Sequence, residues 1–177
     1  MTISLAIDTS TSRTVVGIVR DGEVLFEQFH EGATDHGRAL SELVVGALAT
    51  QQNIDQVVVG MGPGPFTGLR VGITFARTFA LARQIPVIGV CSLDAIALDQ
   101  SDYIVATDAR RKEIYWARYS GGIRVDGPHV SKPAEVAGHI LGLFPDVESL
   151  VKHAAKAEVK EPMYLRRPDA IPTAERS

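Results

Sequence analysis

The run GMGPGPFTGLR, from Gly60 to Arg70, has the composition of a ligand-binding loop. Its glycines let the backbone turn sharply and approach a ligand closely, and unpaired N–H groups at the start of a following helix can cradle a phosphate. The run is not a Walker loop, because no Lys-Ser or Lys-Thr pair follows its final glycine, and it also lacks the dinucleotide-binding spacing. The alternative interpretation is a tight turn that lets a strand and a helix pack closely.

Acidic and hydroxyl groups gather in a second segment, Asp8-Thr9-Ser10, which follows an alternating apolar stretch. This segment is repeated at an offset of 100 positions, since Ala6-Ile7-Asp8-Thr9 is answered by Ala106-Thr107-Asp108-Ala109 and Gly22 by Gly122. Each copy sits in a pattern of strand, polar bend, strand, turn and strand. The repeat predicts a duplicated β-hairpin unit and two similar lobes that face a cleft.

Histidine and cysteine do not point to a metal site. No two histidines are spaced as an i, i+4 pair, so we interpret each as a surface or capping residue. The single cysteine, Cys91, excludes an internal disulfide and lies in the apolar run PVIGVCSL, which predicts an inert buried thiol. The sequence shows no Ser-His-Asp constellation either. The five histidines are His30, His36, His129, His139 and His153.

Two helices are predicted on either side of the strand that leads into the Gly-rich loop. The first, from about His36 to Thr50, has one apolar stripe, with Asp35 or Thr34 as its N-cap. The second, from about Gly68 to Arg83, is apolar nearly all round and carries a small residue every fourth position, so it must be buried on more than one side. We predict a protein interface on this pair, made by Leu40, Leu43, Val44, Ala47, Leu69, Gly72, Ile73, Ala76 and Ala80.

The remaining pattern predicts an α/β protein. Strands are expected near residues 3–7, 15–19 and 24–29, with a tight hairpin at Asp21-Gly22, and again at 57–59 and 87–90. Short helices are expected at 93–98, 134–143 and 147–157. We divide the chain into an N-terminal lobe with the interface helices (1–100), a smaller C-terminal lobe (101–163) and a polar tail (164–177).

Composition limits the classes of protein that the chain can belong to. The sequence has 177 residues, of which 45% are hydrophobic, and a formal net charge of −3, so it has no overall basic field for nucleic acid. Any role with RNA would be shared with a more basic partner. No apolar run approaches the roughly 20 residues that a spanning helix needs, and Met1 to Asp8 lacks the features of a signal peptide. We expect a cytoplasmic protein.

Four motifs in order resemble one known family. They are AIDTSTSRTVVGIVRDGEVL, GMGPGPFTGLRVGITFARTFA, the strand pair around ATDARRKEIYWARY, and the terminal YLRRPDA. Together they resemble the TsaB (YeaZ) family, over about Met1 to Tyr119 continuously and then in the tail. The resemblance implies the actin-like ATPase fold of sugar kinases, Hsp70 and actin, which is ribonuclease H-like, with duplicated lobes and a reduced second lobe.

The resemblance also implies a function. TsaB-like proteins are non-catalytic, activating subunits of the complex that transfers a threonylcarbamoyl group to N6 of the adenosine next to the anticodon in tRNAs. The implied partners are a TsaD-like catalytic subunit, contacted through the two helices above, and a TsaE-like ATPase; the chain alone is expected to form a homodimer. Contact with tRNA is expected mainly through the complex. No cofactor is implied for this chain, whereas ATP and a metal ion are implied for the partner subunits.

A comparison with the catalytic paralogue supports the absence of catalytic and metal-binding residues. In that paralogue, a strand resembling IPVIGV is followed by His-His-Met-Glu-Gly-His, whose second and last histidines hold a metal ion. Here the strand runs into Cys91-Ser-Leu-Asp-Ala-Ile96, so the two ligand positions hold Ser92 and Ile96. Isoleucine has no donor atom, and the paralogue's metal site cannot form in this chain.

The actin-like resemblance gives the two polar bends a candidate role. In actin-like enzymes the first bend touches phosphate and carboxylates hold magnesium, so Asp8, Thr9, Ser10 and Asp108 form a candidate nucleotide or phosphate site. The alternative is that these side chains satisfy backbone groups of the bends. Two other functions stay open: a nucleotide-binding phosphotransferase or ATPase, and a metallopeptidase. The candidates for charge contacts with tRNA are Arg110, Arg111, Lys112, Arg166 and Arg167.

Overall fold

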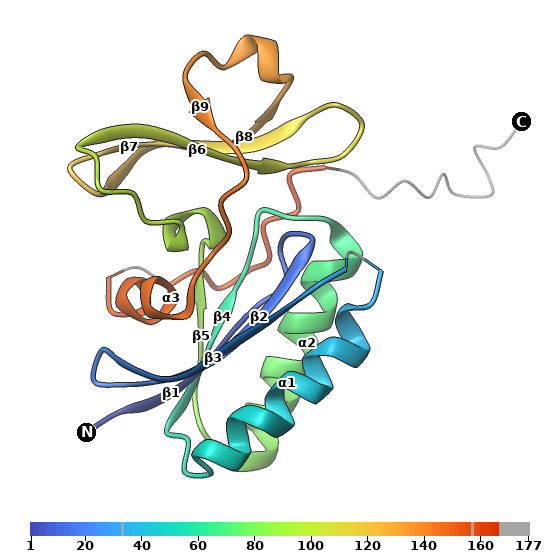
Figure 1. The fold of residues 1–177 in the computed structure, drawn as a ribbon, viewed down its shortest axis with the longest axis vertical. Coiled ribbons are helices and arrows are strands. Elements are labelled where there is room, and N and C mark those ends of the chain that lie inside the picture. The colour runs from blue at the N-terminus through green and yellow to red at the C-terminus, as the bar shows by residue number, and fades with distance from the viewer. Residues whose placement is uncertain (33, 157, 167–177) are drawn as a thin grey trace, which may run out of the picture.

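The larger of two β-sheets contains five strands in the order β3-β2-β1-β4-β5 (Figure 1). The structure is a computed structural model that describes residues 1–32, 34–156 and 158–166. Strands β1 (Ile3–Asp8), β2 (Arg13–Arg20) and β3 (Glu23–Glu31) are consecutive and antiparallel, whereas β4 (Gln56–Gly60) and β5 (Val87–Val90) follow the direction of β1. The carboxyl ends of β1, β4 and β5 therefore meet at one edge of the sheet.

The predicted hairpin between β2 and β3 is confirmed. Asp21 and Gly22 have φ angles of 48° and 89°, which are the left-handed conformations that a tight hairpin of this kind requires. Glycine and aspartate tolerate this region better than most residues do. The turn thus sets the register in which the alternating apolar residues of β2 face the core.

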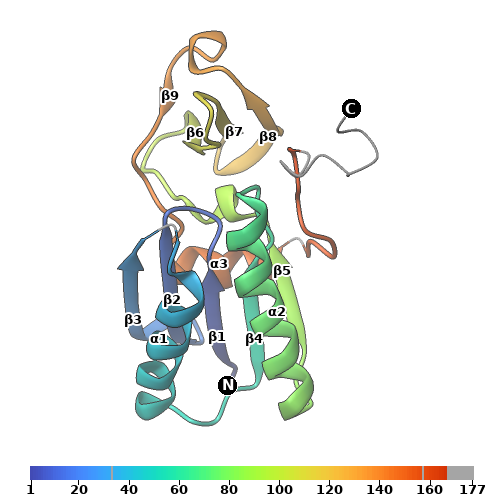
Figure 2. The same ribbon diagram turned by 90° about the vertical axis from the view of Figure 1, so that its right-hand side faces the viewer.

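Two helices cover one face of the larger sheet and a third covers the other (Figure 2). Helix α1 (His36–Thr50) connects β3 to β4, and α2 (Phe66–Arg83) connects β4 to β5. The predicted bounds of α1 are confirmed, with Asp35 at the N-cap position, and α2 begins two residues before the predicted Gly68 because Pro65 already stands in the extended N-cap conformation. Helix α3 (Val147–Ala154) packs on the opposite face.

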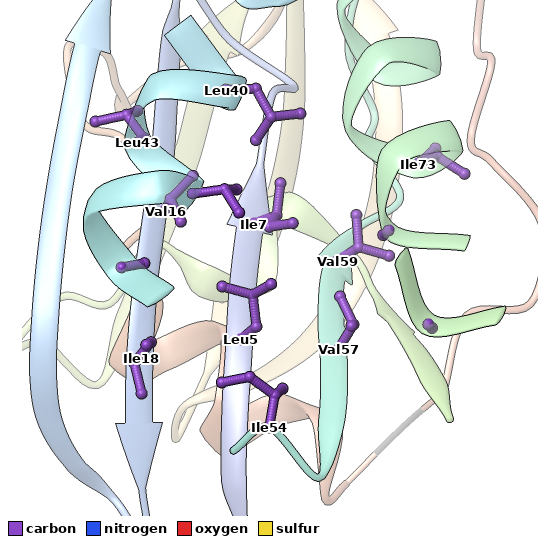
Figure 3. Close-up of a cluster of buried hydrophobic side chains, with 14 of the residues drawn as sticks. Leu5, Ile7, Val16, Ile18, Leu40, Leu43, Ile54, Val57, Val59 and Ile73 are labelled. Atoms are coloured by element: carbon purple, nitrogen blue, oxygen red, sulfur yellow. The ribbon is translucent and has the colours of Figure 1, made fainter. Parts of the chain in front are cut away.

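The main core lies between the sheet and the helices α1 and α2 (Figure 3). Strand residues such as Leu5, Ile7 and Val59 are fully buried there against Leu40 and Ile73 of the two helices. A smaller cluster under α3 buries the alternate residues of the same strands. Both faces of the sheet are covered, which is why its parallel strand β4 reads as a continuous apolar run.

The smaller sheet repeats the order of the larger one. Its strands β6 (Asp102–Asp108), β7 (Ile114–Ser120), β8 (Ile123–Ser131) and β9 (His139–Ile140) are arranged β8-β7-β6-β9, with β9 parallel to β6. This is the order β3-β2-β1-β4 of the first sheet. The duplicated β-hairpin unit predicted from the offset of 100 is therefore present, in a reduced form.

Two of the short helices expected from the sequence differ in the structure. Residues 93–98 contain only the 3₁₀ turn η1 (Ser92–Ala95), and the helix expected over 134–143 is wrong, since this segment holds the turn η2 (Pro133–Glu135) followed by β9. Gly138 and Gly142 have φ angles of 76° and 83°, which no right-handed helix can contain. The helix expected over 147–157 exists as α3, which packs on the first sheet although its residues fall within the range assigned to the smaller lobe.

Two sets of contacts join the sheets. Asp94 of η1 accepts a hydrogen bond from the Tyr119 hydroxyl (2.7 Å) and pairs with Arg124 (3.0 Å), both from the second sheet. Residues 158–166, here named the C-terminal strap, run along β5 and end at the second sheet (Figure 2). The strap is held by backbone hydrogen bonds from Val159 to Gly89 and from Met163 to Met61, each 2.8 Å.

None of the helices in the described part of the chain is long and apolar enough to cross a membrane.

Candidate functional site

Asp8 lies at the carboxyl end of β1 and is buried. Its Oδ1 atom accepts hydrogen bonds from the Ser10 backbone N–H (2.8 Å) and hydroxyl (2.6 Å), and its Oδ2 atom accepts one from the Ser92 hydroxyl (2.6 Å). The Ser92 hydroxyl in turn accepts the Gly62 N–H at 3.1 Å. Both oxygens of Asp8 are thus engaged inside the fold, which supports the structural interpretation of this bend.

The pKa of Asp8 is raised because burial disfavours its charged form, although the hydrogen bonds from Ser10 and Ser92 act in the opposite direction. A carboxyl group whose pKa is higher in the folded state stabilises the fold most below its unfolded pKa, near 3.8, and this contribution is lost as the pH rises through the folded pKa.

We expect the Asp8→Asn variant, which carries no ionisable group here, to lose this part of the pH dependence. Urea unfolding of both proteins between about pH 4 and about pH 7 measures the difference. The free energy of unfolding of the wild type should fall relative to that of Asp8→Asn as the pH rises. Parallel profiles would show that burial does not raise the pKa of Asp8.

Thr9 explains the stripe of small residues on α2. Its hydroxyl donates to the Gly68 carbonyl (2.7 Å) and accepts the Gly72 N–H (3.2 Å). A Cβ atom on Gly72 would lie 2.4 Å from that hydroxyl oxygen, and one on Gly64 would lie 2.4 Å from the Ser10 carbonyl oxygen. The glycines therefore let the β1–β2 bend and the start of α2 pack together, so this part of the stripe serves a contact within the chain.

The side chains predicted to form an interface lie inside the chain's own core, and this detail of the prediction is corrected. Apart from Gly72, which packs against Thr9, they belong to the main core that the apolar stripes of α1 and α2 form with the sheet. The surface that the two helices present is a different one. The buried residues are Leu40, Leu43, Val44, Ala47, Leu69, Gly72, Ile73, Ala76 and Ala80.

The outward surface of α1 and α2 is partly apolar. Val45 is 71% exposed, and Leu48, Val71, Phe75 and Phe79 are only partly buried against the core. We name these five residues, with the exposed threonines 74 and 78 between them, the outer helix surface. The prediction that a partner binds to the two helices therefore applies to the outer helix surface and not to the buried stripe.

A cleft of about 680 Å³ lies between the start of α2 and the second sheet. One wall is made by residues 64–68 and by the β1–β2 bend, and the other by the β6–β7 hairpin with Arg110 and Arg111. Asp108 also lines the cleft, where its Oδ1 atom accepts the Arg110 N–H at 3.0 Å. Of the four candidate residues for a nucleotide site, Asp108 alone is among those that line this cleft, while Asp8, Thr9 and Ser10 lie beneath it.

The basic residues predicted to contact tRNA gather near this cleft. Arg110, Arg111 and Lys112 are consecutive non-glycine residues with left-handed backbone conformations, which carry the chain around the β6–β7 hairpin. Arg166 donates to the Ala109 carbonyl (2.7 Å) and pairs with Glu113 (3.1 Å), so it attaches the C-terminal strap to that hairpin. Arg167, like the rest of the tail from residue 167, lies outside the described residues.

The residues considered for a metal site have other roles. Ser92 belongs to the Asp8 network, Ile96 is buried, and no group of three or more potential ligands occurs among the described residues. Cys91 is fully buried, which confirms the predicted burial, and burial raises the pKa of its thiol to about 12, as expected of an inert thiol. His36 was interpreted as a surface or capping residue and is instead 6% exposed, and its Nδ1 atom shares a buried hydrogen bond of 2.7 Å with the Thr14 hydroxyl.

Comparison with known proteins gives consistent matches. A family model described as TsaD, tRNA N6-adenosine threonylcarbamoyltransferase, matches residues 31–170. An uncharacterized protein of Mycobacterium tuberculosis is 45% identical over 96% of this chain and 94% of its own length. The TsaB protein of Escherichia coli, whose name assigns it to tRNA threonylcarbamoyladenosine biosynthesis, is 35% identical over 65% of this chain and 54% of its own length. The aligned part thus spans about half of that relative.

Two solved structures share the fold. The YeaZ structure from Pseudomonas aeruginosa has a TM-score of 0.75 and 26% identity over 88% of this chain and 91% of that one. A second structure, of an uncharacterized protein with similarity to the peptidase YeaZ from the same organism, has a TM-score of 0.79 and 25% identity over 94% of this chain and 100% of that one. The expected α/β fold with a reduced second lobe is confirmed.

Proposed function

Because the chain belongs to the TsaB/YeaZ family of TsaD-like proteins, we propose that it is a non-catalytic, activating subunit of the complex that forms N6-threonylcarbamoyladenosine in tRNA. The non-catalytic part of the proposal is supported by the residues Ser92 and Ile96. In the sequence comparison above, they occupy the two positions at which the catalytic paralogue has its metal ligands. The Ser92 hydroxyl is bound to Asp8, and Ile96 is 2% exposed and has no donor atom. Both residues are buried in the interior of the fold, which supports the proposal.

The proposed partner is a TsaD-like catalytic subunit, and the outer helix surface is its proposed contact. Partly exposed aromatic and aliphatic side chains next to arginines, here Arg77 and Arg83, are typical of a protein interface. The same surface would serve a homodimer when the catalytic subunit is absent. In this proposal ATP and the metal ion belong to the TsaD-like subunit and a TsaE-like ATPase, and tRNA is bound mainly by the complex.

Neither alternative function gains support from the site. A phosphotransferase or ATPase would need carboxylates that are available to magnesium, whereas both oxygens of Asp8 accept hydrogen bonds within the fold. A metallopeptidase would need a cluster of metal ligands, and the described residues contain none.

The proposal is tested with the double variant Val45→Glu/Thr74→Glu, which places two carboxylates on the outer helix surface. We expect association with the TsaD-like subunit to weaken at least about 100-fold, because two unpaired charges would be buried in the interface. Light scattering of the mixed subunits measures association, and nucleoside analysis of tRNA measures the modification. Both should be lost, while the melting temperature of the variant alone stays close to that of the wild type.

A matched control places the same charges elsewhere. Ile123 and Val125 are 69% and 57% exposed on β8, on the other sheet, so Ile123→Glu/Val125→Glu should leave association and modification unchanged. Unchanged association of the Val45→Glu/Thr74→Glu variant would refute the interface. Failure of the wild-type chain to raise the yield of modified tRNA would refute the activating role itself.

A further inference from the structure

The cleft between the lobes is positively charged, although the chain as a whole carries a formal charge of −3. Among the residues that the structure describes, Arg110, Arg111 and Arg166 line it, together with one carboxylate, that of Asp108. Glu113 lies next to this wall and is paired with Arg166. His36 also lines the cleft, and burial lowers its pKa, which disfavours the charged form of its imidazole. The cleft thus attracts an anion on an otherwise acidic protein.

The opposite wall offers hydrogen-bond donors. The first N–H groups of α2 have no partner within the helix, and α2, an 18-residue helix, has no side chain that caps them. Phe66, Thr67 and Gly68, which carry these N–H groups, line the cleft. An anion between this helix terminus and the arginines would be bound from both sides.

Thr107 gives a second and independent indication of a ligand. It is only 6% exposed, lines the cleft, and its hydroxyl oxygen is buried without a hydrogen-bond partner in the described part of the chain. An unsatisfied buried hydroxyl destabilises a fold, so its position in a ligand-sized cleft favours a polar group of a ligand as the missing partner.

Two aromatic rings stand at the rim of the same cleft. Phe66 and Tyr164 are each 38% exposed, and their ring centroids lie 4.8 Å apart in a tilted arrangement. Exposed rings of this kind are platforms on which an unpaired base stacks. The same cleft therefore has both a candidate anion site and a pair of aromatic rings in its lining.

The charges favour a phosphodiester over a magnesium-bound di- or triphosphate. Free nucleoside triphosphates carry magnesium, which prefers carboxylate ligands, yet Asp8 is engaged within the fold and Asp108 accepts a backbone N–H. A phosphodiester has one negative charge and is bound by arginine and helix N–H groups without a metal.

We propose that the cleft binds one nucleotide of a single-stranded RNA segment, with its phosphate between Arg110, Arg111 and the start of α2 and its base against Phe66 and Tyr164. The Thr107 hydroxyl forms a hydrogen bond with this nucleotide, as donor or as acceptor. The inference rests on the proposed function, since it takes RNA to be what the complex acts on, and it gives this subunit a direct contact with that RNA.

The test uses the full chain and a fluorescein-labelled single-stranded oligoribonucleotide, with fluorescence anisotropy as the measurement. Arg110→Ala/Arg111→Ala should weaken binding about tenfold or more and reduce the slope of log K against log salt by about 1.4, at roughly 0.7 per phosphate contact. The control Arg20→Ala/Lys156→Ala removes the same charge from positions outside the cleft and should change neither value.

A second variant separates binding from folding. Thr107→Val removes the unpaired hydroxyl at nearly constant volume, so it should raise the melting temperature of the free chain and at the same time weaken RNA binding. Tyr164→Leu should weaken binding by about tenfold, as expected for the loss of a stacking contact. A control titration with ADP and magnesium should displace the RNA only weakly.

Three results would overturn the inference: no binding of the oligoribonucleotide by the wild type, equal loss in the Arg20→Ala/Lys156→Ala control, or displacement of RNA by ADP and magnesium at lower concentration than by unlabelled RNA. Its failure is distinct from failure of the proposed function. Activation of tRNA modification that persists in Arg110→Ala/Arg111→Ala, with RNA binding unchanged, would refute the cleft and leave the activating role intact.

Discussion

Substitution of Gly60 by alanine is expected to destabilise the protein by at least about 3 kcal/mol, or to prevent folding altogether. A Cβ atom at this position, the last of β4, would lie 1.7 Å from Oδ2 of Asp8 and 2.6 Å from the Ser92 hydroxyl. Neither neighbour can move away, because Asp8 is held by Ser10 and the Ser92 hydroxyl also accepts the Gly62 N–H. Urea unfolding monitored by circular dichroism measures the loss.

Gly37 provides the control for this substitution. It lies in the first turn of α1, has no neighbouring atom within 4 Å of an added Cβ, and has no positive φ angle. Gly37→Ala should leave stability unchanged or raise it by up to about 1 kcal/mol, because alanine favours the helix. A Gly60→Ala variant as stable as Gly37→Ala would show that Asp8 does not occupy the position described.

Substitution of Asp94 by alanine should destabilise the protein by about 2–3 kcal/mol and release the second sheet from the first. Asp94 accepts the Tyr119 hydroxyl at 2.7 Å and pairs with Arg124 at 3.0 Å. Tyr119 is 2% exposed and would remain buried without an acceptor for its hydroxyl, and Arg124, 24% exposed, would lose its carboxylate partner and keep the Gly127 carbonyl. Urea unfolding gives the stability, and limited proteolysis should show earlier cleavage between the sheets, near residues 96–101.

Asp126→Ala is the matched control, because it removes an aspartate that also has a partner, His129, but at an exposed site of the second sheet. Pairs at exposed sites contribute little to stability, and the proteolysis pattern should not change. Equal effects of the two aspartate variants would mean that Asp94 does not join the sheets.

Regular alternation and helix periodicity were sufficient to predict most of the secondary structure. The three antiparallel strands, the Asp21-Gly22 hairpin, α1 and α2 were all predicted from local pattern, and the offset of 100 predicted the second sheet. The helix expected over 134–143 failed because single glycines, at 138 and 142, decide against a helix that apolar spacing alone would allow.

The site was less predictable, since its contacts join residues far apart in the sequence. Ser92 meets Asp8 across 84 positions, and nothing local to Asp8-Thr9-Ser10 indicates that both carboxylate oxygens are used. The stripe of small residues on α2 was a correct signal of close packing, but the sequence could not identify Thr9 as the neighbour. The same stripe led to buried residues being named as an interface, because a pattern of apolar residues does not distinguish a core from a contact surface.

His36, Thr107, Phe66 and Tyr164 were not predicted as parts of the cleft. Phe66 and Tyr164 are 98 positions apart, and the sequence gives no reason to pair them. The repeat offered one usable signal, since Thr107 takes the place of Ile7 in the second copy. A hydroxyl in the position of a core isoleucine indicates a polar function for the second bend.

The C-terminal strap has a mechanical consequence. Proteins with two lobes around a cleft usually close on their ligand by rotating about a few hinge residues. Here the strap spans both lobes, with Val159 and Met163 hydrogen-bonded to the first and Arg166 to the β6–β7 hairpin of the second. A rotation that changed the width of the cleft would therefore have to be accommodated by the short segment between Met163 and Arg166. The strap therefore restricts changes in the distance between the two lobes. We expect a ligand to be selected by its fit to the existing width of the cleft and not by closure of the lobes around it.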